Sequence, residues 1–287
     1  MTLCIVLRFL LEPIRHKRIR ALGMGLAFFI ILPLLTSSIC FAERIHSRAA
    51  VAIDATSGKI LFDKNSHLRI PPASTTKLMT AIVTVENEDL SRVVTVSKKA
   101  SHVRPSRAGF KEGDKLTIEG LLYAALLRSA NDAAVALAEA VAGSEKQFVR
   151  LMNQKAAAIG ARDTRFINAN GLPGPGQHIT ALDLSRILGY AMKYPKLREI
   201  LGTPETMIVT EDGRAFLFRN TDKLLWSDEK VIGGKTGYTR RAKHCFVCVA
   251  QKDRKTIIVA LLGSPSRRNL WKDTEKLIAK GLHNRKA

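Results

Sequence analysis

Three short motifs carry residue types that support acyl-transfer chemistry. They are, in order along the chain, Ser74-Thr75-Thr76-Lys77, Ser129-Ala130-Asn131 and Lys235-Thr236-Gly237. A serine hydroxyl attacks a carbonyl only if a nearby base removes its proton, and a neutral lysine three residues later on the same helix face can act as that base. Each motif alone is a weak signal. Their order indicates a serine acyl-enzyme site that uses lysine, not histidine, as the base.

The spacing Ser-x-x-Lys occurs a second time, at Ser227 and Lys230. A chance match to so short a pattern is expected about once in a chain of this length. The second copy lies in a charged stretch without apolar periodicity. Ser74, in contrast, begins the segment 74–85, in which apolar residues recur at helical spacing. We therefore predict Ser74 as the nucleophile.

Each motif can be given a chemical role. Ser74 is the predicted nucleophile and Lys77 its base, and the pKa of Lys77 must fall through burial and through the positive charge of Lys235. Ser129 is expected to relay a proton between Lys77 and the leaving group. Asn131 is expected to donate to the peptide carbonyl of the substrate. The alternative interpretation of the first two motifs is structural, as helix caps and a solvated charge.

The third motif is predicted to lie at a strand edge. There Lys235 and Thr236 suit the recognition of a terminal carboxylate, and Gly237 lets a substrate strand approach the backbone. We expect the backbone N–H groups of Ser74 and Tyr238 to form an oxyanion hole, since two fixed donors must face the developing alkoxide. The structural alternative is a tight turn into a strand. No set of Cys and His has metal-ligand spacing, so we expect no metal and no cofactor.

The rest of the chain contains the elements that must position these motifs. Alternating residues predict a hairpin over 49–62. Helical periodicity or capping signals predict helices over 74–85, 117–127, 131–142, 148–159, 180–192 and 270–282. Strands expected to be antiparallel neighbours occupy 215–219, 237–251 and 256–262. Thr117 and Thr180 are predicted N-caps, with Asp183 in position for a capping box.

Strands at both ends of the chain enclose a helical middle. This order predicts an α+β fold in which an antiparallel sheet is flanked by helices, with a helical lobe inserted over approximately 98–214. Cys245 and Cys248 lie three apart in a strand-like run, so their side chains point to opposite faces and a disulfide between them is sterically poor. We expect two buried thiols.

The N-terminal region has the composition of an export segment. Basic residues at 15–20 precede the uncharged stretch 21–42, which ends in Cys40-Phe41-Ala42. We expect a signal peptide over 1–42, with an uncleaved membrane anchor as the alternative because about 20 apolar residues can span a bilayer. The catalytic domain then occupies 43–287, and we expect no separate C-terminal β domain.

The net charge of +21 limits the classes of molecule that the protein is expected to bind. A strongly basic chain often binds nucleic acid, but this chain has an export segment and no nucleic-acid module. We therefore expect no nucleic-acid partner. An anionic surface of the cell envelope suits the charge better.

The motifs with their surroundings resemble the low-molecular-mass penicillin-binding proteins, which are D-alanyl-D-alanine carboxypeptidases and related endopeptidases. The similar segments are 72–80, 126–134, 170–173 with 180–184, and 234–239. The resemblance extends over essentially all of 48–285. It implies a serine β-lactamase/DD-peptidase-like fold and export to the periplasm or envelope. It also implies that the substrate is the D-Ala-D-Ala end of a peptidoglycan stem peptide, and that penicillins and other β-lactams inhibit by acylating Ser74.

Several alternatives accompany this interpretation. A β-lactamase shares the motifs but also needs a carboxylate to activate the deacylating water, and no Glu-x-x-Leu-Asn segment lies between Asn131 and Lys235. We therefore expect slow release of penicilloyl groups. The motifs do not distinguish a carboxypeptidase from an endopeptidase that cuts cross-links. A non-catalytic sensor of muropeptides or β-lactams would not need the base. Family members can place an arginine near the carboxylate pocket, and Arg267 and Arg268 are the candidates.

Overall fold

The computed structural model describes residues 44–283, so the expected leader over 1–42 lies outside the described residues. A five-stranded antiparallel sheet has the order β2-β1-β9-β8-β7. Its strands are β1 (Ala49–Asp54), β2 (Ile60–Lys64), β7 (Val231–Thr239), β8 (Lys243–Lys252) and β9 (Lys255–Ser264). Within the described range, no helix combines the length and apolar character needed to cross a membrane.

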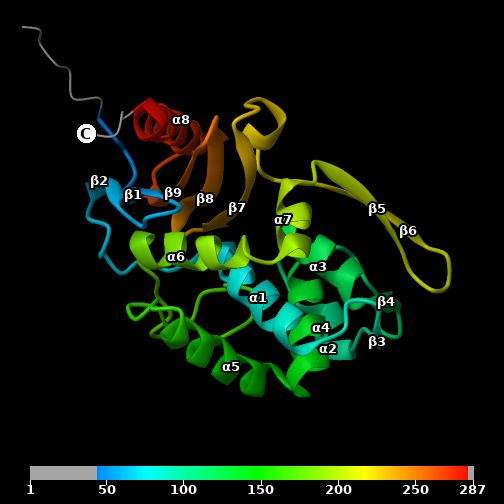
Figure 1. The fold of residues 1–287 in the computed structure, drawn as a ribbon. Helices are drawn as coiled ribbons and strands as arrows, with labels where there is room; N and C mark the ends of the chain where they lie inside the picture. Colours follow the sequence, from blue (N-terminus) through cyan, green and yellow to red (C-terminus); the bar gives the residue numbers. More distant parts are fainter. Residues whose placement is uncertain (1–43, 284–287) are drawn as a thin grey trace, which may run out of the picture. The chain divides into compact units, whose positions relative to one another are not determined.

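Helices cover both faces of this sheet (Figure 1). One face carries α8 (Arg267–His283), and the other carries α6 (Ala181–Ala191). The remaining helices are α1 (Lys77–Asn87), α2 (Lys98–His102), α3 (Ile118–Leu126), α4 (Asn131–Ala142), α5 (Glu145–Ala158) and α7 (Pro195–Gly202). Two short ribbons pair β3 (Val93–Thr95) with β4 (Lys115–Thr117) and β5 (Glu205–Val209) with β6 (Ala215–Arg219). The α+β fold predicted from the sequence is confirmed.

The strand alternation divides the interior into two cores. In β8, Cys245 and Val247 face the core shared with α1 and α3 to α6, whereas Phe246 and Cys248 face the core under α8. This follows from the two-residue period of a strand. Both cysteines are buried and free, as expected. Burial raises the pKa of the Cys245 thiol to about 12, so it stays protonated at neutral pH.

The first and last strands of the sheet are neighbours. β1 pairs with β9 over its full length, from Ala49 opposite Leu262 to Asp54 opposite Ile257. A buried carboxylate strengthens this junction: Asp273 on α8 accepts hydrogen bonds from the backbone N–H groups of His46 and Ser47, each at 2.8 Å. The segment that precedes β1 is thereby attached to the C-terminal helix.

Two of the strand predictions are wrong in part. The run 237–251 is not one strand, because a turn at 240–242 separates β7 from β8. The strand 215–219 has the predicted bounds, but it pairs with β5 in a separate ribbon and not with the main sheet. Alternation identifies a strand without identifying its partner.

The predicted caps are confirmed, with one difference. Thr117 accepts from the N–H of Gly120 at the start of α3, and Thr180 accepts from the N–H of Asp183 at the start of α6. The capping box is not closed. The Asp183 carboxylate instead accepts from the N–H of Asp163 at 2.8 Å and the hydroxyl of Thr164 at 2.9 Å, and so ties the 163–164 loop to α6.

Candidate active site

The candidate nucleophile lies in a tight turn that leads into α1. Residues Ala73–Thr76 form a 3-10 turn that contains Ser74, and Lys77 is the first residue of α1. The sequence predicted both residues in the first turn of one helix, and the structure divides them between two helix types. Ala73 adopts φ +49, a left-handed conformation that is uncommon for a residue with a side chain. The turn therefore stores strain directly before Ser74.

Lys77 is completely buried and makes three polar contacts. Its Nζ lies 3.1 Å from the Ser74 Oγ, 2.6 Å from the Asn131 Oδ1 and 2.8 Å from the backbone oxygen of Asn170. A neutral amine has two N–H donors and one lone pair. The two carbonyl oxygens take both donors, which leaves the lone pair directed at the serine hydroxyl.

The surroundings of Lys77 favour the neutral amine. Burial lowers its pKa well below the ordinary value, and the positive charge of Lys235 lowers it further, while Asp132 acts in the opposite direction. The sequence had named burial and Lys235 as the two causes, and both operate. The lower pKa increases the share of the neutral lysine, which is the form that can accept the proton of Ser74.

The second motif connects α3 to α4. Ser129 lines the cavity beside Ser74 and adopts φ +62, so the loop holds it in a strained conformation. In the described part of the chain its hydroxyl makes no hydrogen bond to Lys77, so the proton relay stays a prediction. Asn131 is more central than predicted: besides holding Lys77, its Nδ2 donates to the carbonyl of Pro105 at 2.6 Å.

The third motif lies on β7, the edge strand that faces Ser74. A Cβ built on Gly237 would lie 3.0 Å from the backbone nitrogen of Ser74, a tighter contact than Cβ atoms normally make, so glycine lets the strand pass this close without displacing the nucleophile turn. The close approach places the β7 backbone near Tyr238 beside the N–H group of Ser74. The sequence predicts an oxyanion hole formed by the N–H groups of these two residues. Tyr238 is 54% exposed, and its ring packs against that of His244 with centroids 4.5 Å apart.

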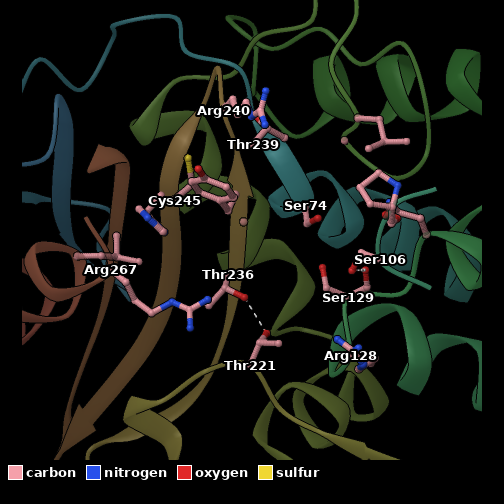
Figure 2. A pocket seen from close by; sticks show the side chains of 18 of the residues that line it. Ser74, Ser106, Arg128, Ser129, Thr221, Thr236, Thr239, Arg240, Cys245 and Arg267 are labelled. Atoms are coloured by element: carbon pink, nitrogen blue, oxygen red, sulfur yellow. Dashed lines mark hydrogen bonds between the residues drawn. The ribbon is translucent and has the colours of Figure 1, made fainter. Parts of the chain in front are cut away.

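Lys235 and Thr236 occupy different environments on β7. Lys235 is buried, and burial lowers its pKa to about 7 against the opposing charge of Asp222. Its Nζ donates to the Thr236 carbonyl at 3.1 Å. The Thr236 hydroxyl shares a 2.7 Å hydrogen bond with that of Thr221, a residue that the sequence analysis did not single out. Figure 2 shows this pair at the wall of the cavity.

The loop 169–171 supplies a part of the site that sequence reasoning gave no role. The Asn170 carbonyl accepts from Lys77, and the Ala169 carbonyl accepts from Thr80 Oγ1 at 2.6 Å. A Cβ on Gly171, which has φ +84, would lie 1.8 Å from the Ala73 oxygen. The sequence feature that indicates this loop is Gly171, which lies in the segment 170–173 that is similar to the family. Every residue type has a backbone carbonyl, so the residue types alone could not predict that the carbonyls at 169 and 170 act as acceptors.

These residues surround a cavity of about 780 Å³. Its lining includes Ser74, Ser129, Asn131, Thr236, Gly237 and Tyr238. Lys77 and Lys235 are buried behind that surface. Arg267, at the start of α8, lines the cavity and Arg268 does not, which separates the two candidates left by the sequence (Figure 2). Among the described residues, no Asp or Glu lines the cavity.

The comparisons with known proteins agree with this geometry. The family model described as D-alanyl-D-alanine carboxypeptidase matches residues 37–266. The chain belongs to this family. It is 34% identical over 236 residues to the D-alanyl-D-alanine carboxypeptidase DacF of Bacillus subtilis, which covers 79% of this chain and 61% of that protein. The chain thus spans about three fifths of that relative's length.

Other proteins similar to this chain carry different activity names. A D-alanyl-D-alanine endopeptidase of Pseudomonas aeruginosa is 31% identical over 242 residues, which cover 82% of this chain and 77% of that protein. The DD-transpeptidase of Streptomyces K15 superimposes with a TM-score of 0.79 at 32% identity, over 83% of this chain and 98% of that one. The fold is therefore that of a serine DD-peptidase.

Proposed function

We propose that this protein is a serine-type D-Ala-D-Ala carboxypeptidase that trims peptidoglycan stem peptides through an acyl-enzyme on Ser74. The observation that carries the proposal is the buried Lys77, whose Nζ lies 3.1 Å from the Ser74 Oγ and within 2.8 Å of two carbonyl oxygens. In the neutral amine these carbonyls take both N–H groups and leave the lone pair for the Ser74 hydroxyl. A binding protein has no use for a buried base. The family match supports the substrate class.

The first half of the reaction forms the acyl-enzyme. Lys77 takes the proton of the Ser74 hydroxyl as Oγ attacks the carbonyl carbon of the penultimate D-Ala. The resulting alkoxide is stabilised by the N–H groups of Ser74 and Tyr238. When the C–N bond breaks, the proton passes from Lys77 through Ser129 to the amine of the departing D-Ala. Water then hydrolyses the ester and restores the serine.

Substrate binding uses the two sides of the cavity. Lys235, Thr236 and Arg267 suit the terminal carboxylate, which would lie beside the Thr236 hydroxyl. Gly237 permits a substrate strand to lie along β7, and Asn131 is placed to donate its second amide N–H to the peptide carbonyl. A β-lactam presents the same carboxylate and a strained amide, so we expect it to acylate Ser74.

The same site supports an endopeptidase as the second candidate. The acyl half of the reaction is identical, and a relative of similar identity is named an endopeptidase. We infer that the protein is exported and acts at the cell envelope, since peptidoglycan lies there. The basic charge suits an anionic envelope surface.

One experiment separates these functions. The purified protein and its Ser74→Ala variant are incubated with a D-Ala-D-Ala pentapeptide and with cross-linked muropeptides, and the products are measured by mass spectrometry. Loss of one alanine from the pentapeptide, absent in the variant, is the expected result. Cleavage of cross-linked material alone would make the protein an endopeptidase. No cleavage, with a fluorescent penicillin still bound at Ser74, would support a sensor.

A second measurement tests the separation from β-lactamases. No carboxylate lines the cavity in the described residues to activate the deacylating water as the carboxylate of a β-lactamase does. We expect the penicilloyl group to remain on Ser74 for many times longer than acylation takes. Rapid multiple turnover of a penicillin would contradict this expectation.

A further inference from the structure

Two cationic side chains line the cavity next to the second motif. Arg128 directly precedes Ser129, and Lys223 follows the Thr221 that bonds to Thr236. The two segments are joined, because the Thr221 N–H donates to the Leu127 carbonyl at 3.2 Å. Arg128 and Lys223 therefore belong to one wall. Figure 2 shows Arg128 on the same side of the cavity as Ser129 and Thr221.

Neither cation has an anionic partner in the described part of the chain. Cations elsewhere on the surface form ion pairs, such as Lys196 with Glu119 at 2.9 Å and Arg219 with Glu205 at 2.9 Å. Arg128 and Lys223 form none with residues 44–283, and no carboxylate of that range lines the cavity with them. A cavity lined by one sign of charge concentrates ligands of the opposite sign.

Their position corresponds to the leaving-group side of the reaction. The terminal carboxylate is expected beside Thr236, and the acyl part is expected to run along β7 past Tyr238 toward Arg240, in the turn that follows the strand (Figure 2). Arg128 and Lys223 belong to the two joined segments that carry Ser129 and Thr221, on the Thr236 side of the cavity and so on the leaving-group side of the scissile bond. A departing D-Ala carries a single carboxylate, for which Lys235, Thr236 and Arg267 already suffice.

We propose that Arg128 and Lys223 form a second anion subsite that holds an additional carboxylate carried by the leaving group. The substrate class is a peptide whose residue after the scissile bond bears a second free carboxylate, as an acidic amino acid or a diamino diacid does. This inference rests on the proposed function, because it names a preference within that reaction. Both side chains are exposed, so each contact contributes modestly and depends on salt.

The test compares two donors that differ only in charge. Peptides with the same acyl part end in D-Ala-D-Glu or in D-Ala-D-Gln, which are nearly isosteric. We expect kcat/KM for the D-Glu peptide to exceed that for the D-Gln peptide, and this ratio to fall about fivefold in an Arg128→Gln, Lys223→Gln double variant at low ionic strength. Added salt should reduce the ratio of the wild-type protein.

Arg268→Gln is the matched control, because Arg268 is an exposed cation next to Arg267 that does not line the cavity. We expect the control to keep the wild-type ratio. The subsite is refuted if the double variant keeps the ratio too, or if the control loses it equally, since a general field would then be responsible.

A second readout does not require hydrolysis. The same two peptides compete with fluorescent penicillin for Ser74. The ratio of their inhibition constants is measured in the wild-type protein and in each variant. Absence of turnover of D-Ala-D-Ala donors would overturn the proposed function alone, and the competition ratio would still decide the subsite. Equal competition by the two peptides in the wild-type protein would overturn the subsite.

Discussion

The Nζ of Lys77 lies 3.1 Å from the Oγ of Ser74, and no surface of Lys77 is exposed. The two residues are three positions apart, but the geometry depends on a 3-10 turn that ends where α1 begins. The base therefore depends on the protein interior for its pKa and for its orientation.

The role of Lys77 as base predicts the effect of Lys77→Arg. A guanidinium stays charged at all accessible pH values and cannot accept the Ser74 proton. We expect the acylation rate by fluorescent penicillin to fall at least about 100-fold. The control is Lys230→Arg in the second Ser-x-x-Lys copy, which should acylate at the wild-type rate. Near-normal acylation by the Lys77 variant would exclude Lys77 as the base.

The 2.6 Å contact between Asn131 and Lys77 predicts a change in pH dependence. In Asn131→Asp, a carboxylate beside the amine favours the ammonium form and raises the pKa of Lys77. We expect the acidic limb of the acylation rate profile to move to higher pH by about one unit or more. Asn65→Asp, on the exposed turn after β2, adds the same charge and should leave the profile unchanged. A limb that moves to lower pH would contradict this assignment.

Gly171 is predicted to be irreplaceable for steric reasons. Alanine there meets the Ala73 oxygen at 1.8 Å and adopts φ +84, so the nucleophile turn must shift. Gly213 has the matching φ of +86 with no atom within 4 Å, which isolates the conformational cost of about 1 kcal/mol. We expect Gly213→Ala to keep full acylation with a slightly lower Tm, and Gly171→Ala to lose both acylation and several degrees of Tm. Equal behaviour of the two variants would show that the contact is unimportant.

The pKa of Lys235, lowered to about 7 by burial, predicts how substrate binding depends on pH. Above pH 7 the ammonium loses its proton, so KM for a peptide with a free terminal carboxylate should rise. The negative charge of Asp222 supports the ammonium, and its loss in Asp222→Asn should move this rise to lower pH. A peptide amide, which lacks the carboxylate, is the control and should show no such rise. If KM rises at a higher pH in the variant than in the wild-type protein, the role of Asp222 is contradicted.

Some structural errors of the sequence analysis have a local cause. The turn between β7 and β8 is Arg240-Arg241-Ala242, which contains none of the Gly, Pro, Asn or Asp residues that signal a turn, so 237–251 resembled one strand. The predicted capping box at Asp183 failed because the carboxylate found better donors in the 163–164 loop. Distant partners override local preferences when both are available.

The sequence by itself determined what depends on spacing along the chain. Spacing alone predicts that Ser74 and Lys77 lie close together and that Cys245 and Cys248 point to opposite faces of a strand. The residue types predict the N-caps at Thr117 and Thr180. The order of the three motifs indicates the family. The tertiary structure alone decided the contact of Lys77 with Asn131, the acceptor at Asn170, the Thr221–Thr236 pair and the choice of Arg267. Helix and strand periods are local properties, whereas these contacts join residues 15 to 93 positions apart and exist only once the sheet and helices pack.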